Sequence, residues 1–138
     1  MAWGADCERE AGLRPEPVVL PAPRRGEIWS VLLPGQPDDP HQPRPALVVS
    51  HDVRNRLSDD VIVAPIFSHG ASGPTHVPIG KGVGGINRGS VVFCEELTTI
   101  DRAFLTRGPW GSPVEAAVMA AVVRAIRRAV GDAVPEPA

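Results

Sequence analysis

Short apolar runs bounded by proline and glycine constrain this fold more than any other feature of the chain. The 138 residues include 16 prolines and 14 glycines, and the runs between them are rich in valine and isoleucine. β-branched residues favour strands, and proline and glycine favour the turns that join them. This pattern excludes a helical bundle. We predict strands at five of these runs: Glu27–Leu33, Ala46–Val49, Val61–Phe67, His76–Ile79 and Ser90–Cys94.

A helix is predicted near the C-terminal end of the chain. Ser112-Pro113-Val114-Glu115 has the form of a capping box with proline at the first helical position, and Gly131 predicts the helix end. Apolar residues recur between these signals at helical spacing. Three arginines near the negative end of the helix dipole are interpreted as a solvated face rather than an RNA site.

The composition is that of a globular protein with one domain. We predict a flexible extension at residues 1–23, the domain at residues 24–131 and a tail at residues 132–138. A net charge of −2 provides no global field that gathers nucleic acid, so RNA or DNA binding requires a local groove.

Cysteine usage and hydropathy predict a cytoplasmic protein. Cys7 and Cys94 form neither a metal-ligand spacing nor a disulfide pair that the pattern supports. The N-terminus lacks the basic start and long apolar run of a signal peptide, and no stretch approaches the length of a membrane span. We expect no metal, no cofactor and no membrane contact.

Arg44 is the strongest candidate for chemistry. It lies between Pro43 and Pro45 at the start of a predicted buried strand, and both prolines restrict the backbone around it. One interpretation is that Arg44 caps the strand and pairs with a carboxylate. The other is that its planar guanidinium binds a phosphate through two hydrogen bonds.

The polar segments around the predicted strands add further candidates. The loop at residues 34–43 carries Asp39 and His41 directly before Arg44, and is either a site of proton transfer or an ordinary solvated loop. Residues 51–58 are expected to form a polar turn or one short helical turn. Pro65 predicts a bulge or an unpaired N–H position in the third strand. Glu95 and Glu96, if extended, point to opposite faces and so do not form a catalytic pair.

Six short motifs, in order, resemble the MazF/PemK/Kid toxins of bacterial toxin–antitoxin systems. The likeness extends from about Arg25 to the C-terminal helix. The motifs are Arg25-Gly26-Glu27-Ile28-Trp29, Arg44-Pro45-Ala46-Leu47-Val48-Val49, Asn55-Arg56, Val63-Ala64-Pro65, Pro74-Thr75-His76-Val77, and Ser90-Val91-Val92 with Thr99-Ile100-Asp101.

The resemblance implies a mainly β (α+β) fold, a small SH3-like barrel of twisted antiparallel strands with a C-terminal α-helix, that works as a homodimer. It also implies a metal-independent endoribonuclease that cleaves single-stranded RNA, including mRNA, and is silenced by a MazE-like antitoxin. In such enzymes the 2′-OH attacks the phosphate, which leaves a 2′,3′-cyclic phosphate and a 5′-hydroxyl. The protein then has to position the phosphodiester, move protons and stabilise charge.

The same resemblance assigns roles to individual residues. Arg44 is expected to stabilise the phosphorane, and we favour this role over acid catalysis because arginine titrates above about pH 12. Asp39 lies where the family has a glutamate and is the candidate general base, with His41 as a substitute. Many relatives have a threonine where this chain has Phe67; a bulge at Pro65 would let Ser68 supply that hydroxyl.

Glu95 is a secondary catalytic candidate from the resemblance to Kid-like relatives. His69 and His76 join Arg44, His41 and Ser68 as expected RNA contacts. Few stacking platforms are expected, because the chain has three tryptophans and three phenylalanines.

Two other functions stay open. The related CcdB toxins resemble this fold but poison DNA gyrase without cutting RNA, and Phe67 in place of threonine favours that class. A degenerate member would only bind antitoxin.

Overall fold

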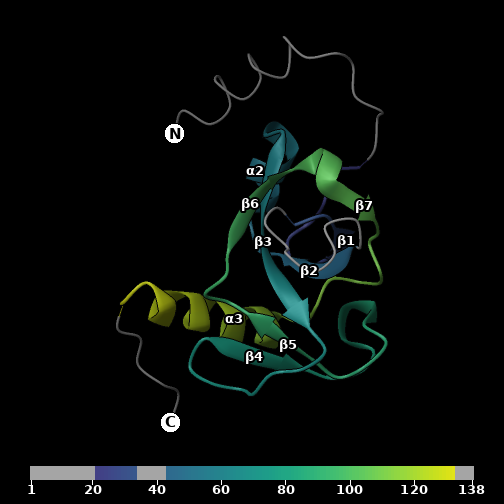
Figure 1. The fold of residues 1–138 in the computed structure, drawn as a ribbon. Helices are drawn as coiled ribbons and strands as arrows, with labels where there is room; N and C mark the ends of the chain where they lie inside the picture. The colour runs from purple at the N-terminus through teal and green to yellow at the C-terminus, as the bar shows by residue number, and fades with distance from the viewer. Residues whose placement is uncertain (1–20, 34–42, 133–138) are drawn as a thin grey trace.

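The computed structural model describes residues 21–33 and 43–132 and shows a twisted antiparallel sheet with a C-terminal helix (Figure 1). The sheet has seven strands in the order β4-β5-β3-β2-β1-β7, and β6 pairs with β3 off this path. The strands are β1 (Ile28–Val31), β2 (Arg44–Val48), β3 (Asp60–Phe67), β4 (His76–Ile79), β5 (Ser90–Phe93), β6 (Thr98–Asp101) and β7 (Leu105–Arg107). The helices are α2 (Asp52–Leu57), η1 (Val83–Gly85), η2 (Arg102–Phe104) and α3 (Ala116–Ala129). The five predicted strands and the short turn of helix before β3 are confirmed.

β3 belongs to two parts of the sheet. Its residues 60–63 pair with β6, whereas Ile66 and Phe67 pair with β5. Pro65 pairs with Ala46 of β2, and the register along β2 is unbroken through it. The prediction of a bulge at Pro65 is therefore wrong. Pro65 instead falls where β3 changes partner from β6 to β5. The second alternative, an unpaired N–H position, stays a prediction.

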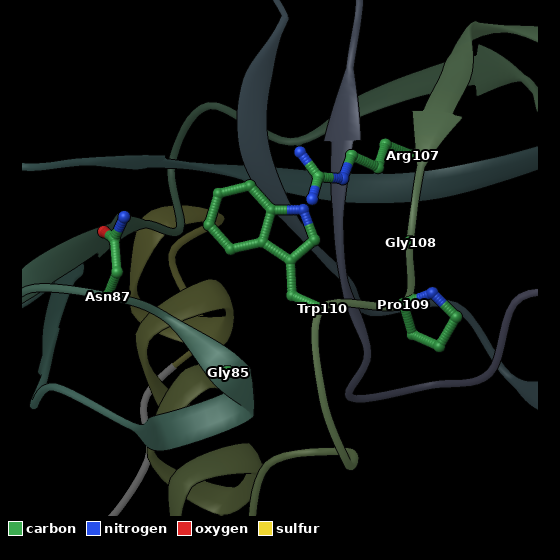
Figure 2. Close-up of a pocket in the computed structure, with 6 residues that line it drawn as sticks. All are labelled: Gly85, Asn87, Arg107, Gly108, Pro109 and Trp110. Atoms are coloured by element: carbon green, nitrogen blue, oxygen red, sulfur yellow. The ribbon is translucent and has the colours of Figure 1, made fainter.

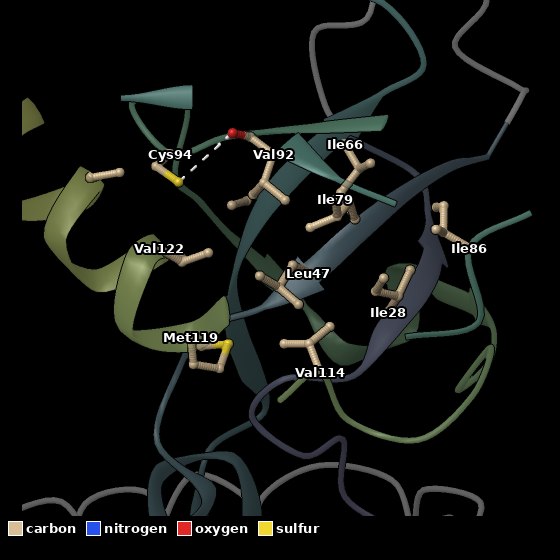
Figure 3. Packing of buried hydrophobic residues seen from close by; sticks show 12 residues of the cluster. Ile28, Leu47, Ile66, Ile79, Ile86, Val92, Cys94, Val114, Met119 and Val122 are labelled. Carbon is tan, nitrogen blue, oxygen red and sulfur yellow. Dashed lines mark hydrogen bonds between the residues drawn. The ribbon is translucent and has the colours of Figure 1, made fainter. Parts of the chain in front are cut away.

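Two hydrophobic cores lie on opposite faces of the central strands, because successive side chains of a strand alternate between faces. The first core packs α3 against the sheet, with Met119 and Val122 over Leu47 and Val92 (Figure 3). The second core lies between the remaining strands and is built from Val31, Leu33, Ala46, Val48, Val61, Val63 and Ile100. Trp29 is half-buried against this second core.

Cys94 belongs to the first core. Its side chain is fully buried, and burial raises the pKa of its thiol to about 11. Because the thiolate is the reactive form of cysteine, Cys94 is a packing residue and not a nucleophile.

Helix α3 begins later than the sequence predicted. Its N-cap is Glu115, whose side chain makes no capping hydrogen bond, and the first helical residue is Ala116. The predicted capping box is wrong because Val114 is buried in the first core and its N–H donates to Gly26 O at 2.9 Å. The helix end is confirmed: Gly131 has φ +84° and its N–H donates to Arg128 O at 3.1 Å, as in a Schellman motif.

Several predictions concern residues outside the described ranges. These are Asp39 and His41, most of the extension at residues 1–23, and residues 133–138 of the tail. Within the described ranges, no helix has the length and apolar character to cross a bilayer.

Candidate active site

Arg44 is the first residue of β2 and lies at the end of the sheet. It pairs with Val31 of β1, and continuing the β2–β3 register by two residues places it opposite Phe67. Its Nε is buried, yet no residue in the described part of the chain accepts a hydrogen bond from it. The interpretation that Arg44 pairs with a carboxylate finds no support there. An unsatisfied buried donor on a cation costs free energy, which an incoming anion would recover.

Four aromatic rings form a row beside Arg44. Phe67 stacks with His69 at a centroid distance of 6.3 Å and meets Phe93 edge to face at 4.7 Å. Phe93 stacks on His76 at 4.0 Å. Phe67, Phe93 and His76 are half-buried, and His69 is exposed. The chain therefore has a cluster of four aromatic rings packed on one another across β3, β5 and β4, although the sequence predicted few stacking platforms.

Glu95 ends this row. Its Oε1 lies 2.6 Å from His76 Nε2, and its other oxygen accepts a hydrogen bond from the Thr75 hydroxyl. The remaining ring nitrogen of His76 lies 3.1 Å from Ala71 O. The hydrogen bond that His76 donates to Glu95 raises the pKa of His76, and the hydrogen bonds that Glu95 accepts from Thr75 and then His76 lower the pKa of Glu95. The contact is therefore an ion pair whenever His76 is protonated.

Glu95 and Glu96 do not lie in an extended chain, as the sequence argument assumed. Both residues lie in a turn after β5, which aims Glu95 back at His76 and Thr75. The expectation that they form no catalytic pair stays a prediction.

Arg44 and the Glu95–His76 pair are parts of one face but do not touch. Their strands are separated by the steps β2 to β3, β3 to β5 and β5 to β4. At a spacing of about 4.8 Å between strands, this places the two backbones roughly 14 Å apart. One phosphate cannot contact both groups at hydrogen-bond distance without a long reach by Arg44. The pair is better placed to contact a neighbouring nucleotide.

The Glu95–His76 contact predicts a pH window of added stability. The raised pKa of His76 gives stabilisation that is present below its ordinary value of 6.5 and is lost as pH rises through the raised value. The lowered pKa of Glu95 gives stabilisation present above 4.5 and lost as pH falls through the lowered value. We expect His76→Gln to destabilise the fold most between about pH 4.5 and 6.5, by less than about 1 kcal/mol because both groups are partly exposed.

Urea unfolding at several pH values measures this difference. His69→Gln is the matched control, because no carboxylate bonds His69 in the described part of the chain. A destabilisation by His76→Gln that stays constant from pH 5 to pH 9 would contradict the assignment.

Ser68 does not lie where the sequence analysis proposed. Ser68 is exposed in a bend directly after β3, and the unbroken register leaves Phe67 opposite Arg44. The re-aiming by a bulge that would bring Ser68 into the family threonine's place is therefore absent from β3. In the described ranges, no three His, Cys, Asp or Glu side chains gather in a way that could hold a metal ion.

Sequence reasoning missed Phe93 and Thr75 as site residues. The signal for Phe93 was present, because alternation along β5 turns it away from the core that holds Val92. Its partner across the hairpin is His76. Thr75 had no comparable signal, since its contact with Glu95 joins residues 20 positions apart.

Comparison with known proteins decides the family. Residues 24–130 match the family model described as PemK-like, MazF-like toxin of type II toxin–antitoxin system. The chain belongs to this family. The resemblance found in the sequence is thereby confirmed, and the MazF-like fold explains why the sheet carries a C-terminal helix.

Individual MazF-like relatives agree. Endoribonuclease EndoA of Bacillus subtilis (strain 168) is 37% identical over 86 residues, which cover 60% of this chain and 74% of that protein. The Mycobacterium tuberculosis toxin MazF-mt6 has a TM-score of 0.63 at 30% identity over 75% of this chain and 95% of its own. A mycobacterial endoribonuclease solved with its cognate antitoxin has a TM-score of 0.68 at 24% identity, covers 83% of this chain and all of its own (100%), and supports the fold alone.

Proposed function

We propose that this protein is an endoribonuclease toxin that cleaves single-stranded RNA, including mRNA, at short motifs without a metal. The observation that carries the proposal is Arg44, a cation at the start of the central strand β2 whose buried Nε has no partner among the described residues. Membership of the MazF-like family and the endoribonuclease relatives support it. We propose that the protein acts in the cytoplasm, where it would meet mRNA.

The reaction needs no group beyond the RNA and the protein. The 2′-oxygen attacks the adjacent phosphorus and forms the cyclic phosphate, while the bond from phosphorus to the 5′-oxygen breaks. The 2′-OH loses a proton, and the departing oxygen gains one. Arg44 stabilises the extra negative charge of the phosphorane, in the way that fixed donors stabilise other transition states.

The remaining residues position the strand and move protons. The row from His69 to His76 stacks bases on either side of the cut, because base stacking on aromatic rings tolerates any sequence. Glu95 fixes the His76 ring that ends the row. Asp39 or His41, in the loop before Arg44, removes the proton of the 2′-OH. Ser68 is the candidate for a second, weaker donor to the phosphate, since it lies in the bend after β3 and not in the family threonine's place.

The partners follow from the family. We propose a homodimer and a MazE-like antitoxin that silences it, because solved relatives include an endoribonuclease with its cognate antitoxin and a MazE–MazF structure from Deinococcus radiodurans. The exposed apolar side chains of Val123 on α3 and of Val130, its C-cap, give this chain a surface that a partner can cover.

The test is cleavage of a long end-labelled RNA by the full chain in excess EDTA. We expect discrete cuts that leave 5′-hydroxyl ends, and no cuts in DNA of the same sequence, which lacks the 2′-OH nucleophile. RNA that stays intact would contradict the proposal. Gyrase or antitoxin binding would then become the function to test, as the place of Phe67 first suggested.

A further inference from the structure

A polar cleft lies away from Arg44. It has a volume of about 430 Å³ and is lined by Gly85, Asn87, Arg107, Gly108, Pro109 and Trp110 (Figure 2). Arg107 pairs with Ser30 of β1, whereas Arg44 pairs with Val31, the next residue of that strand. Strand β1 therefore lies between the two arginines, with the cleft on its β7 side and Arg44 on its β2 side.

The tryptophan in this cleft is held in place by the protein. The Trp110 backbone N–H donates to Ile28 O at 2.9 Å, and its indole Nε1 donates to Ser30 Oγ at 3.0 Å. The one polar atom of the ring is therefore used within the protein. What remains for a ligand is the apolar surface of a half-buried indole whose orientation is fixed.

Close backbone packing shapes the rest of the cleft. Gly85 has φ +89°, and a Cβ there would lie 2.4 Å from Trp110 O. A Cβ on Gly108 would lie 2.7 Å from the Trp29 ring. Both positions exclude a side chain, so the cleft owes its form to glycines that larger residues cannot replace without moving Trp110 or Trp29.

The polar lining of the cleft suits a nucleotide. Arg107 and Asn87 are exposed and point into the same space as the indole, and no carboxylate lines it. In the described ranges, no hydrogen bond or ion pair engages either side chain. A guanidinium binds phosphate, an amide both donates to and accepts from a base edge, and an indole stacks on a base. The volume is within the usual range for small ligands.

We propose that this cleft binds one nucleotide of the RNA substrate, with the base on Trp110 and the phosphate on Arg107. The proposal rests on the ribonuclease function above. It adds a base-binding subsite on the far side of β1 from Arg44, so the recognised RNA is longer than the segment that contacts Arg44 and the aromatic row.

The test uses a 2′-O-methyl RNA of mixed sequence, which binds but cannot be cleaved, with affinity measured by fluorescence anisotropy. We expect Arg107→Ala to weaken binding about 3- to 10-fold and Trp110→Leu about 5-fold or more. Asn87→Ala tests the amide without disturbing the core, should Trp110→Leu fail to fold. Arg88→Ala is the matched control, because Arg88 is an exposed arginine next to Asn87 that does not line the cleft.

Kinetics separate this subsite from the reaction site. With a cleavable RNA, Arg107→Ala should raise KM by a similar factor and leave kcat unchanged, because the lost contact is equal in ground and transition states. Equal weakening by Arg107→Ala and Arg88→Ala would overturn the proposal, since it would reflect general charge. Unchanged RNA affinity with lost antitoxin binding would overturn it in favour of a protein-binding cleft. Either result leaves cleavage by wild type, and so the proposed function, intact.

Discussion

Replacing Arg44 with alanine is expected to lower the rate of RNA cleavage roughly 10²- to 10³-fold, the cost of removing one donor from a charge-stabilising site. The loss should appear in kcat, since the phosphorane carries more charge on its oxygens than the substrate does. Arg44→Lys should recover only part of the rate, because an ammonium lacks the planar fork that binds two phosphate oxygens. Single-turnover cleavage of one defined RNA measures all three proteins.

Stability supplies an independent readout for the same variants. Because Arg44 Nε is buried without an acceptor in the described part of the chain, Arg44→Ala removes an unsatisfied donor. We expect its free energy of unfolding to equal or exceed that of wild type. Arg56→Ala is the control, because it removes an exposed arginine from α2 with the same charge change. Full activity in Arg44→Ala would contradict the site assignment. Lost activity with marked unfolding would show that Arg44 is structural.

Ser68→Ala separates the two candidate donors. The unbroken register of β3 leaves Phe67 in the position opposite Arg44, so we expect Ser68→Ala to cost less than Arg44→Ala. A loss as large as that of Arg44→Ala would show that the bend after β3 carries the missing hydroxyl to the phosphate.

The strands were predictable because local composition and tertiary packing agree in them. The runs in β2 and β3 are β-branched, and they form the two central strands whose faces are covered by the two cores. The start of α3 was not predictable from local signals. The sequence of a capping box is present, but the backbone before Ala116 bonds to Gly26, a residue far away in the chain. Tertiary contacts override a cap that contributes only about 1 kcal/mol.

The sequence predicted one part of the candidate site, the cation Arg44, but it did not predict the aromatic rings near it. Arg44 stood out because two prolines and a buried strand leave few reasons to place a charge there. The aromatic row depends on pairing between strands, because Phe67 and His76 both contact Phe93, which lies later in the chain on β5. The same pairing changes the meaning of Phe67. A residue that suggested lost chemistry is the centre of a stacking surface.

Asn55→Ala is expected to destabilise the fold by about 3 kcal/mol. Asn55 is fully buried, and its Nδ2 donates to Ser50 O at 3.0 Å while its Oδ1 accepts from Ser50 Oγ at 2.5 Å. Ser50 Oγ also accepts from Ile62 N at 3.1 Å, so the network joins the end of β2, α2 and β3. Alanine leaves buried groups of Ser50 unpaired and opens a cavity, and each effect costs about 1 to 3 kcal/mol.

Urea unfolding measures the effect as a lower midpoint with an unchanged slope. Asn87→Ala is the control, because Asn87 is exposed and should change stability by less than about 0.5 kcal/mol. The double variant Ser50→Ala with Asn55→Ala should cost less than the sum of the single variants, since the hydrogen bond between Ser50 Oγ and Asn55 Oδ1 is lost in both single variants but is counted only once in the double variant. Strict additivity would show that Ser50 and Asn55 stabilise the fold separately, and that the buried network is not what holds α2 against β3.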